Sequence, residues 1–333
     1  MNSNLTRIAF MDYPLVTVVI PTYNYAHYIL AAIDSVFTQD YPADKLEIVI
    51  VDDGSQDDTA TVVAALNDDR INFHYQQNAG KAAATAKAIE LAKGKYIFNM
   101  DADDYYLSGK IRKTVDIFEA HPNVVHMGNP AKIIWEDSGR EKIEPIPEWM
   151  MGEVIDGDFL NTFFMENNML YGGGSTYAVR AAVIKPIKIT PEINQYIDEY
   201  LIVSILPHGD AYLLSEALSV WRVHGNNYSG KRKSKADLRR KEEQLLASSA
   251  GTLTQLKKLA HIPAHIINLY EFKHQMRIIS VKEKLGEKSI ADLFNFFMYF
   301  CFKNRQKLKV LKKYSAFNRL IPQTLIRVLK GKG

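Results

Sequence analysis

The sequence predicts an α/β fold, with a mostly parallel sheet flanked by helices and a helical C-terminal region after it. Apolar runs alternate with helical patterns over the first hundred residues, and the links between them are short. This alternation is typical of a parallel sheet covered by helices. Beyond residue 236 the pattern is helical, without strand-like alternation. Of the 333 residues, 47% are hydrophobic and 24% are charged, so the chain can build a sizeable core.

Four apolar runs in the first hundred residues are predicted to be strands, at 16–20, 46–51, 71–75 and 95–100, and the composition of the first indicates a buried strand. Three helices are expected, at 26–38, from near residue 57, and at 81–94. Ile29, Ile33 and Val36 give the first of them an apolar stripe. In sheets of this kind, ligands bind beyond the carboxyl ends of the strands.

The stretch from residue 121 to residue 190 is interpreted as short strands and loops, with VVHMG and KIIW as strands. The glycines at 172–174 interrupt any regular element and let a ligand or another backbone approach closely. A helix is expected from Pro191 to Leu206, with Asp198 and Glu199 near its start. A strand with a polar exit follows within 217–227.

Polar and acidic side chains follow three of the predicted strands. The first strand is followed by Thr22, Tyr23 and Asn24, the second by Asp52 and Asp53, and the fourth by Asp101, Asp103 and Asp104. If the strands are parallel, these groups meet at one edge of the sheet. Five carboxylates in one crevice imply a divalent cation, because Mg²⁺ and Mn²⁺ take oxygen ligands.

Each motif also has a structural interpretation. As a bare pattern, Asp101-x-Asp103 is better explained by a solvated acidic turn, and its place after a hydrophobic strand is what favours a metal. Asp53 or Ser55 could cap the helix that starts near residue 57. Lys81 could be a point charge beside a phosphate or an exposed lysine at a helix start. Asp198 could be a helix N-cap, and His224 a hydrogen-bonded structural histidine.

Four segments, in this order and spacing, resemble glycosyltransferase family 2, the inverting enzymes with the GT-A fold. They are VTVVIPTYNYAHYILAAIDSVFTQDYP, LEIVIVDDGSQDDT, NAGKAAATAKAIELAKGKYIFNMDADD, and IDEYL with WRVHGNN. The resemblance covers about residues 14–230. It implies a GT-A domain at 1–230, followed by a basic, mainly helical region at 231–333. It also implies a hexosyl- or N-acetylhexosaminyltransferase that moves sugar from a UDP-sugar to a hydroxyl of a polysaccharide, glycolipid or other glycan.

The resemblance also implies roles for individual residues. The nucleotide sugar would be bound by Pro21, Thr22, Tyr23, Asn24, Asp52, Asp53, Asn78, Gly80, Lys81, Asp101, Ala102 and Arg222. Mn²⁺ or Mg²⁺ would be held by Asp101, Asp103 and His224, with Asp103 the more direct ligand. The general base would be Asp198 or Glu199. Leu201 aligns better with the leucine of the family motif if Asp198 is the base.

Two departures from the family pattern leave the donor sugar and the base open. Thr85 and Ala86 stand where many relatives carry an Arg-Asn pair, and Lys81 would supply the missing positive charge. The acidic pair at 198–199 is Asp-Glu rather than Glu-Asp. Two other functions are weighed against the transferase. One is a degenerate protein that binds sugar nucleotides or acts as a scaffold. The other is a nucleotidyltransferase, which PTYNYAHY disfavours because it contains no glycine.

Charge divides unevenly along the chain. Residues 1–230 carry 17 Lys and Arg against 31 Asp and Glu, whereas residues 231–333 carry 24 against 7. The basic part could face an anionic membrane or polymer. Within it, the aromatic and then basic segment 293–314 fits either a membrane interface or a core helix packed on the enzyme domain. Nucleic acid is a weaker interpretation, since no recognition motif accompanies the charge.

Two features of the sequence bear on the compartment. Cys301 is the single cysteine, which excludes an internal disulfide and fits a reducing compartment. The first residues lack the apolar core of a signal peptide. We therefore expect a cytoplasmic protein, with peripheral attachment to the inner face of the plasma membrane if the basic helices bind lipid. The sequence leaves the oligomeric state open.

Overall fold

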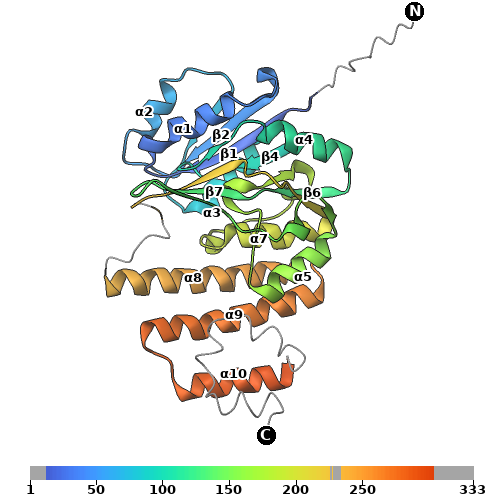
Figure 1. Cartoon of the computed structure of the whole chain (residues 1–333). Helices are drawn as coiled ribbons and strands as arrows, with labels where there is room; N and C mark the ends of the chain where they lie inside the picture. The colour runs from blue at the N-terminus through green and yellow to red at the C-terminus, as the bar shows by residue number, and fades with distance from the viewer. Residues whose placement is uncertain (1–12, 226, 228–233, 304–333) are drawn as a thin grey trace, which may run out of the picture.

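The computed structural model describes residues 13–225, 227 and 234–303 (Figure 1). Its main element is an eight-stranded sheet in the order β3-β2-β1-β4-β10-β6-β11-β9. In that order the strands are Ile71–Tyr75, Leu46–Asp52, Val16–Thr22, Tyr96–Asn99, Ala178–Arg180, Val124–Gly128, Asp210–Leu213 and Val154–Ile155. A four-stranded sheet has the order β5-β12-β7-β8. Its strands are Tyr105–Tyr106, Ser219–Val223, Ala131–Trp135 and Arg140–Ile143.

The strands that carry the polar motifs are neighbours in the large sheet. β1 pairs in parallel with both β2 and β4, and β3 pairs in parallel with β2. β10 is antiparallel to its neighbours β4 and β6. Because β1, β2 and β4 run the same way, their carboxyl ends lie at one edge of the sheet, as the sequence predicts.

Helices cover both faces of the large sheet (Figure 1). They are α1 (Ala26–Phe37), α2 (Thr59–Ala64), α3 (Lys81–Leu91), α4 (Lys110–Ala120), α5 (Gly157–Asn167), α6 (Ala181–Ile184) and α7 (Ile197–Ile205). Side chains of β1 alternate between two cores: Val18 and Ile20 join the α1 and α4 side, and Val19 joins the other. The predicted α1 stripe is buried against the first core.

One predicted helix is shorter than expected. The helix expected from Pro191 begins only at Ile197, after a 3₁₀ turn at Pro191–Ile193. The intervening residues are held by other elements. Asn194 Oδ1 accepts a hydrogen bond from the Ala82 amide, and Ser248 Oγ accepts from the amides of Gln195 and Tyr196. The helix therefore starts late, and its first turn contains the two acidic residues.

The helical C-terminal region is confirmed as far as residue 303. It consists of α8 (Lys235–Leu256), α9 (Ala264–Leu285) and α10 (Ile290–Lys303), which lie in successive layers below the sheet (Figure 1). Leu256 of α8 and Ile266 of α9 belong to the same core as β1 and α7. Residues 304–314 of the segment expected at a membrane or in a core lie outside the described residues. Within the described ranges, no helix is long and apolar enough to cross a bilayer.

Candidate functional site

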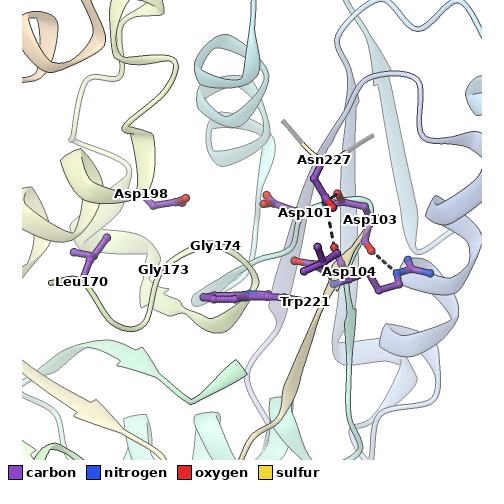
Figure 2. A pocket seen from close by; sticks show the side chains of 11 residues that line it. Asp101, Asp103, Asp104, Leu170, Gly173, Gly174, Asp198, Trp221 and Asn227 are labelled. Carbon is purple, nitrogen blue, oxygen red and sulfur yellow. Dashed lines mark hydrogen bonds between the residues drawn. The ribbon is translucent and has the colours of Figure 1, made fainter. Parts of the chain in front are cut away.

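Three carboxylates converge in the loop between β4 and β5 (Figure 2). Asp101, Asp103 and Asp104 each offer an oxygen within 4.8 Å of the others. The loop is fixed by its backbone, since the Asp101 amide donates to Ser175 Oγ and the Asp104 amide donates to the Asp101 carbonyl. Asp101, Asp103 and Asp104 thus gather after β4 as predicted, but Asp52 and Asp53, which are expected in the same crevice, are not part of this group.

The electrostatics of this cluster suit a divalent cation. Burial and repulsion from Asp101 raise the pKa of Asp103. Burial and repulsion from Asp101 and Asp103 raise the pKa of Asp104 well above its ordinary value. A bound cation would relieve this repulsion, and an oxygen donor set is the kind that Mg²⁺ and Mn²⁺ prefer. The residues therefore fit the metal that the sequence predicts.

The three carboxylates are not equivalent. Asp104 accepts from Ser175 Oγ at one oxygen and from the Arg222 amide at the other, so it anchors the loop to β12. Asp103 Oδ2 accepts from His224 Nε2 at 3.1 Å and Asn227 Nδ2 at 3.0 Å. Among the three, Asp101 and Asp103 are therefore the better candidates for metal ligands.

Arg222 and His224 reach the cluster from β12 and the turn after it. The Arg222 Nε–H donates to the Asp103 carbonyl, and its guanidinium lies 4.7 Å from the Tyr28 ring centroid. His224 stacks on the same ring at a centroid distance of 4.4 Å. The imidazole thus contacts a predicted metal ligand, Asp103, through a hydrogen bond.

A pocket of about 380 Å³ opens over the cluster. It is lined by Asp101, Asp103, Asp104, Leu170, Gly173, Gly174, Asp198, Trp221, Arg222, Val223 and Asn227. In Figure 2 the Asp198 carboxylate points across the pocket toward Asp101. Burial raises the pKa of Asp198 against the opposing effect of Lys81, and repulsion from Asp101 adds to the increase.

The two acidic residues of α7 have different surroundings. Asp198 lines the pocket, whereas Glu199 is buried and paired with Lys273 and Arg277 of α9. Burial would raise the pKa of Glu199, but Arg277 and Lys273 outweigh it and hold the pKa well below its ordinary value. The geometry therefore favours Asp198 over Glu199 as the residue that can reach a ligand in the pocket.

Lys81 lies at the start of α3, beside the acidic cluster. Its Nζ is 2.8 Å from Asp101 Oδ1. Burial alone would lower the pKa of Lys81, but Asp101 and Asp198 outweigh it, and the net pKa is raised. Lys81 is therefore a positive charge beside the acidic cluster, and it is also a helix-start lysine whose side chain is 38% exposed.

The two carboxylates after β2 hold loops together. Asp53 accepts from Gln76 Nε2 and from the amides of Ala79 and Gly80. Asp52 Oδ1 accepts from the Ser55 amide, and both aspartates are buried. The proposed capping of the following helix is wrong, because Asp57 Oδ1, not Asp53 or Ser55, accepts from the Thr59 amide at its start.

The remaining predicted residues surround these loops. Pro21 and Thr22 are buried at the end of β1, Ala102 is buried in the acidic loop, and Tyr23 is 43% exposed. Asn24 is tied to the next loop, since its amide donates to Ser55 Oγ and its side-chain oxygen accepts from the Gln56 amide.

Asn78 and Gly80 shape the loop before α3. The Asn78 side chain donates to the Asp53 carbonyl. Gly80 has φ of 93°, which favours glycine, and a Cβ there would lie 2.7 Å from Asn194 Oδ1.

Several residues of the site are given no role by sequence reasoning. Ser175 bridges Asp101 and Asp104, and Asn227 contacts Asp103. Leu170 and Trp221 supply the apolar wall of the pocket. The run of glycines before Ser175 and the WRVHGNN string contain the only hints of them in the sequence.

The chain resembles known proteins in fold and in sequence. Over 92% of its length it superposes on S. aureus TarS 1–349 in complex with UDP-GlcNAc, covering 92% of that chain with a TM-score of 0.55 and 17% identity. It also superposes on the mannosyltransferase PcManGT from Pyrobaculum calidifontis in complex with GDP-Man and Mn²⁺. That match has a TM-score of 0.51 and 19% identity, and it covers 92% of this chain and 88% of the other. At these identities the likeness shows a shared GT-A fold.

Sequence relatives are named uncharacterized glycosyltransferases. One from Rickettsia typhi is 29% identical over 215 residues, which is 63% of this chain and 64% of that protein. One from Rickettsia prowazekii is 38% identical over 110 residues, which is 33% of this chain and 34% of that protein. The chain thus matches less than two thirds of the length of each of these relatives. The family model of glycosyl transferase family 2 matches residues 17–185, and the chain belongs to this family.

Proposed function

We propose that this protein is a metal-dependent inverting glycosyltransferase that moves a sugar from a nucleotide-diphosphate donor to an acceptor hydroxyl. One observation carries the proposal: Asp198 faces the cluster of Asp101 and Asp103 across a single pocket. Transfer with inversion needs such a pair of features, a base for the acceptor and a cationic centre for the leaving group.

The donor would lie with its diphosphate toward Asp101, Lys81 and Arg222, and we propose a UDP-sugar. The TarS complexes with UDP and UDP-GlcNAc support this choice, whereas the PcManGT complex with GDP-Man and Mn²⁺ makes a guanosine donor the alternative. The transferred group would be a hexosyl group, as in GDP-Man, or an N-acetylhexosaminyl group, as in UDP-GlcNAc. Mn²⁺ or Mg²⁺ bound at Asp101 and Asp103, next to His224, would offset the charge that develops on the leaving diphosphate.

Asp198 would be the general base. Its raised pKa makes it a stronger base than an ordinary aspartate, and its place on the pocket wall lets it take the proton of an acceptor hydroxyl. Attack by that hydroxyl on the anomeric carbon then displaces the nucleotide diphosphate in a single step and inverts the carbon. Lys81 and Arg222 would hold the departing phosphates, and Leu170 and Trp221 would keep water away.

The acceptor would be a glycan, free or lipid-linked, and we propose that α10 brings the enzyme to an anionic membrane. Phe296 of α10 is buried, and its ring centroid lies 6.2 Å from the ring centroid of Phe272 of α9. On the same helix Ile290 is 86% exposed and Phe294 is 60% exposed. Residues 304–333, which follow, carry nine Lys and Arg and no Asp or Glu. Apolar contact next to such charge suits an anionic lipid surface.

The test is release of nucleotide diphosphate from a panel of UDP- and GDP-sugars, with Mn²⁺, with Mg²⁺ and with chelator. Metal-dependent release from one donor, with the sugar passing to water when no acceptor is present, would support the transferase and identify the donor if it is lost in Asp198→Asn and Asp103→Ala. Calorimetry of UDP with Mn²⁺ separates the other functions. Binding without turnover on any acceptor would favour the degenerate relative. No nucleotide binding at all would overturn the proposal.

A further inference from the structure

A cluster of three charged side chains joins α7 to α9 below the pocket. Glu199 Oε2 is 2.6 Å from Lys273 Nζ and 2.9 Å from one terminal nitrogen of Arg277, and its other oxygen is 2.9 Å from the second. Lys273 and Glu199 are 3% and 6% exposed. The guanidinium of Arg277 binds both oxygens of Glu199, and bidentate pairs of this kind are directional. The cluster therefore holds α7 and α9 in one arrangement.

Arg277 holds more than the carboxylate. Its guanidinium lies 3.8 Å from the ring centroid of Tyr196, the residue that precedes α7. It also donates to Ser249 Oγ of α8 at 3.1 Å and to the Tyr270 hydroxyl at 3.0 Å. Arg277 of α9 therefore contacts both Glu199 in the first turn of α7 and Tyr196 before it. Ser249 of α8 helps to hold Arg277 in place.

The same turn is tied to the donor side of the pocket. Ser248 Oγ accepts from the amide of Tyr196, and Asn194 Oδ1 accepts from the Ala82 amide at the start of α3. Lys81, one residue earlier on α3, pairs with Asp101. A continuous set of contacts thus runs from α9, through the residues before α7, to the acidic cluster.

Asp198 lies between the two residues that Arg277 contacts closely, Tyr196 and Glu199. We propose that Lys273 and Arg277 are positioning residues: by fixing Glu199 and Tyr196 they hold the carboxylate of Asp198 at the pocket. The C-terminal helices would then help to position the general base of the transferase. This inference rests on the proposed function, and it explains why the second acidic residue of the pair is present although it does not reach the pocket.

Because the side chains of this cluster are charged, removal of one of them should disturb the position of Asp198. Glu199 meets two cations, and breaking such a buried set by removing one partner is costly, because the remaining charges lose their compensation. A shift of about 1 Å in a reacting group can lower a rate about 100-fold. Loss of the Arg277 fork would therefore act on the step in which Asp198 takes part and leave the donor contacts of Asp101 in place.

The test compares wild type with Arg277→Met, Arg277→Lys and a control, Lys257→Met, in the full chain. Lys257 makes a half-exposed ion pair with Glu271 of α9, from the residue that follows α8. The first readout is hydrogen–deuterium exchange, which does not depend on activity. We expect about tenfold faster exchange for amides of residues 195–201 in Arg277→Met, with no change in β1 or β4 and none in the control.

The second readout is kinetic. We expect kcat of Arg277→Met to fall about 10- to 100-fold, with the donor KM within about threefold of wild type. Arg277→Lys keeps the charge without the fork and should recover part of kcat. A destabilised fold would instead raise exchange throughout and lower donor affinity in both variants, and that outcome would overturn the inference.

Two further outcomes separate this inference from the proposed function. If Arg277→Met turns over donor like an active wild type, or leaves exchange of residues 195–201 unchanged, the positioning role is wrong while the transferase stands. If wild type itself shows no nucleotide binding, the proposed function fails, and with it the catalytic role inferred for this cluster.

Discussion

Lys81 Nζ lies 2.8 Å from Asp101 Oδ1, so an ion pair joins the first residue of α3 to the loop that follows β4. The positive charge of Lys81 offsets part of the repulsion among the carboxylates, as a bound divalent cation would also do. A metal ion and Lys81 would compete for the negatively charged carboxylate of Asp101. A phosphate bound beside them would attract both.

Lys81→Met should therefore have opposite effects on two ligands. Without donor, Mn²⁺ should bind at least as tightly as to wild type, because a competing cation is gone. The donor should bind about tenfold more weakly, since a phosphate loses a charged partner. Calorimetry with Mn²⁺ alone and with UDP in Mn²⁺ measures both. Lys87→Met, on the same helix beside Glu90, is the control and should change neither.

Asp198→Asn should abolish transfer yet stabilise the metal-free protein. A carboxyl whose pKa is raised in the folded state favours folding less as pH rises through that raised value. The neutral Asn side chain avoids this loss, so the thermal midpoint at pH 7 should increase. In wild type, the rate should fall as pH drops, because a protonated Asp198 can no longer accept the proton of the acceptor hydroxyl.

The control for this variant is Asp116→Asn, an exposed carboxylate on α4. It should leave the midpoint and the rate unchanged. A lower midpoint for Asp198→Asn with activity retained would contradict both its role as base and the electrostatic account of the pocket.

Sequence reasoning reached the fold because the strands and helices near the site have local signals. The apolar strands and the motifs after them predict which edge of the sheet carries the site, and the family resemblance places Asp101, Asp103 and Asp198. What it could not give is the environment of each carboxylate. Asp53 and Asp101 are both strand-end aspartates, yet one binds loop amides and the other a lysine. Glu199 and its partners Lys273 and Arg277 are more than 70 residues apart in sequence, and that pairing depends on helix packing alone.

Gly80→Ala should destabilise the protein and weaken donor binding. Its φ of 93° and ψ of 160° lie in a region that is essentially confined to glycine, so alanine should cost about 1–3 kcal/mol, and the added Cβ would meet Asn194 Oδ1 at 2.7 Å. Asn194 would have to release the Ala82 amide, which disturbs the start of α3. Gly139→Ala is the control for a positive φ without a contact, because Gly139 has φ of 65° and an added Cβ there would meet no heavy atom within 4 Å.

Denaturant unfolding measures the loss of stability in both glycine variants, and the donor KM reports whether the loop before α3 is disturbed. Gly139→Ala should cost only the backbone strain of its positive φ and leave donor affinity unchanged. Gly80→Ala should cost more than that and raise the donor KM. Equal losses of stability, with equal donor KM, would show that Asn194 moves freely and does not organise the loop before α3.

The exposed face of α10 should bind anionic membranes. Full-length protein is sedimented with vesicles of phosphatidylcholine, with or without phosphatidylserine. Binding is expected only with the anionic lipid and should weaken as salt is raised, because the charge attraction is screened. Replacing both Ile290 and Phe294 by serine removes two exposed apolar side chains and should lower partitioning about tenfold.

The control is Leu30→Ser, which changes a 40% exposed leucine of α1 and should have no effect on partitioning. Because one face of α10 packs on α9 through Phe296, the double variant should keep the wild-type thermal midpoint. Unchanged sedimentation of the double variant would mean that the basic residues alone attract the lipid. Absence of sedimentation in wild type would assign the exposed face to something other than a membrane.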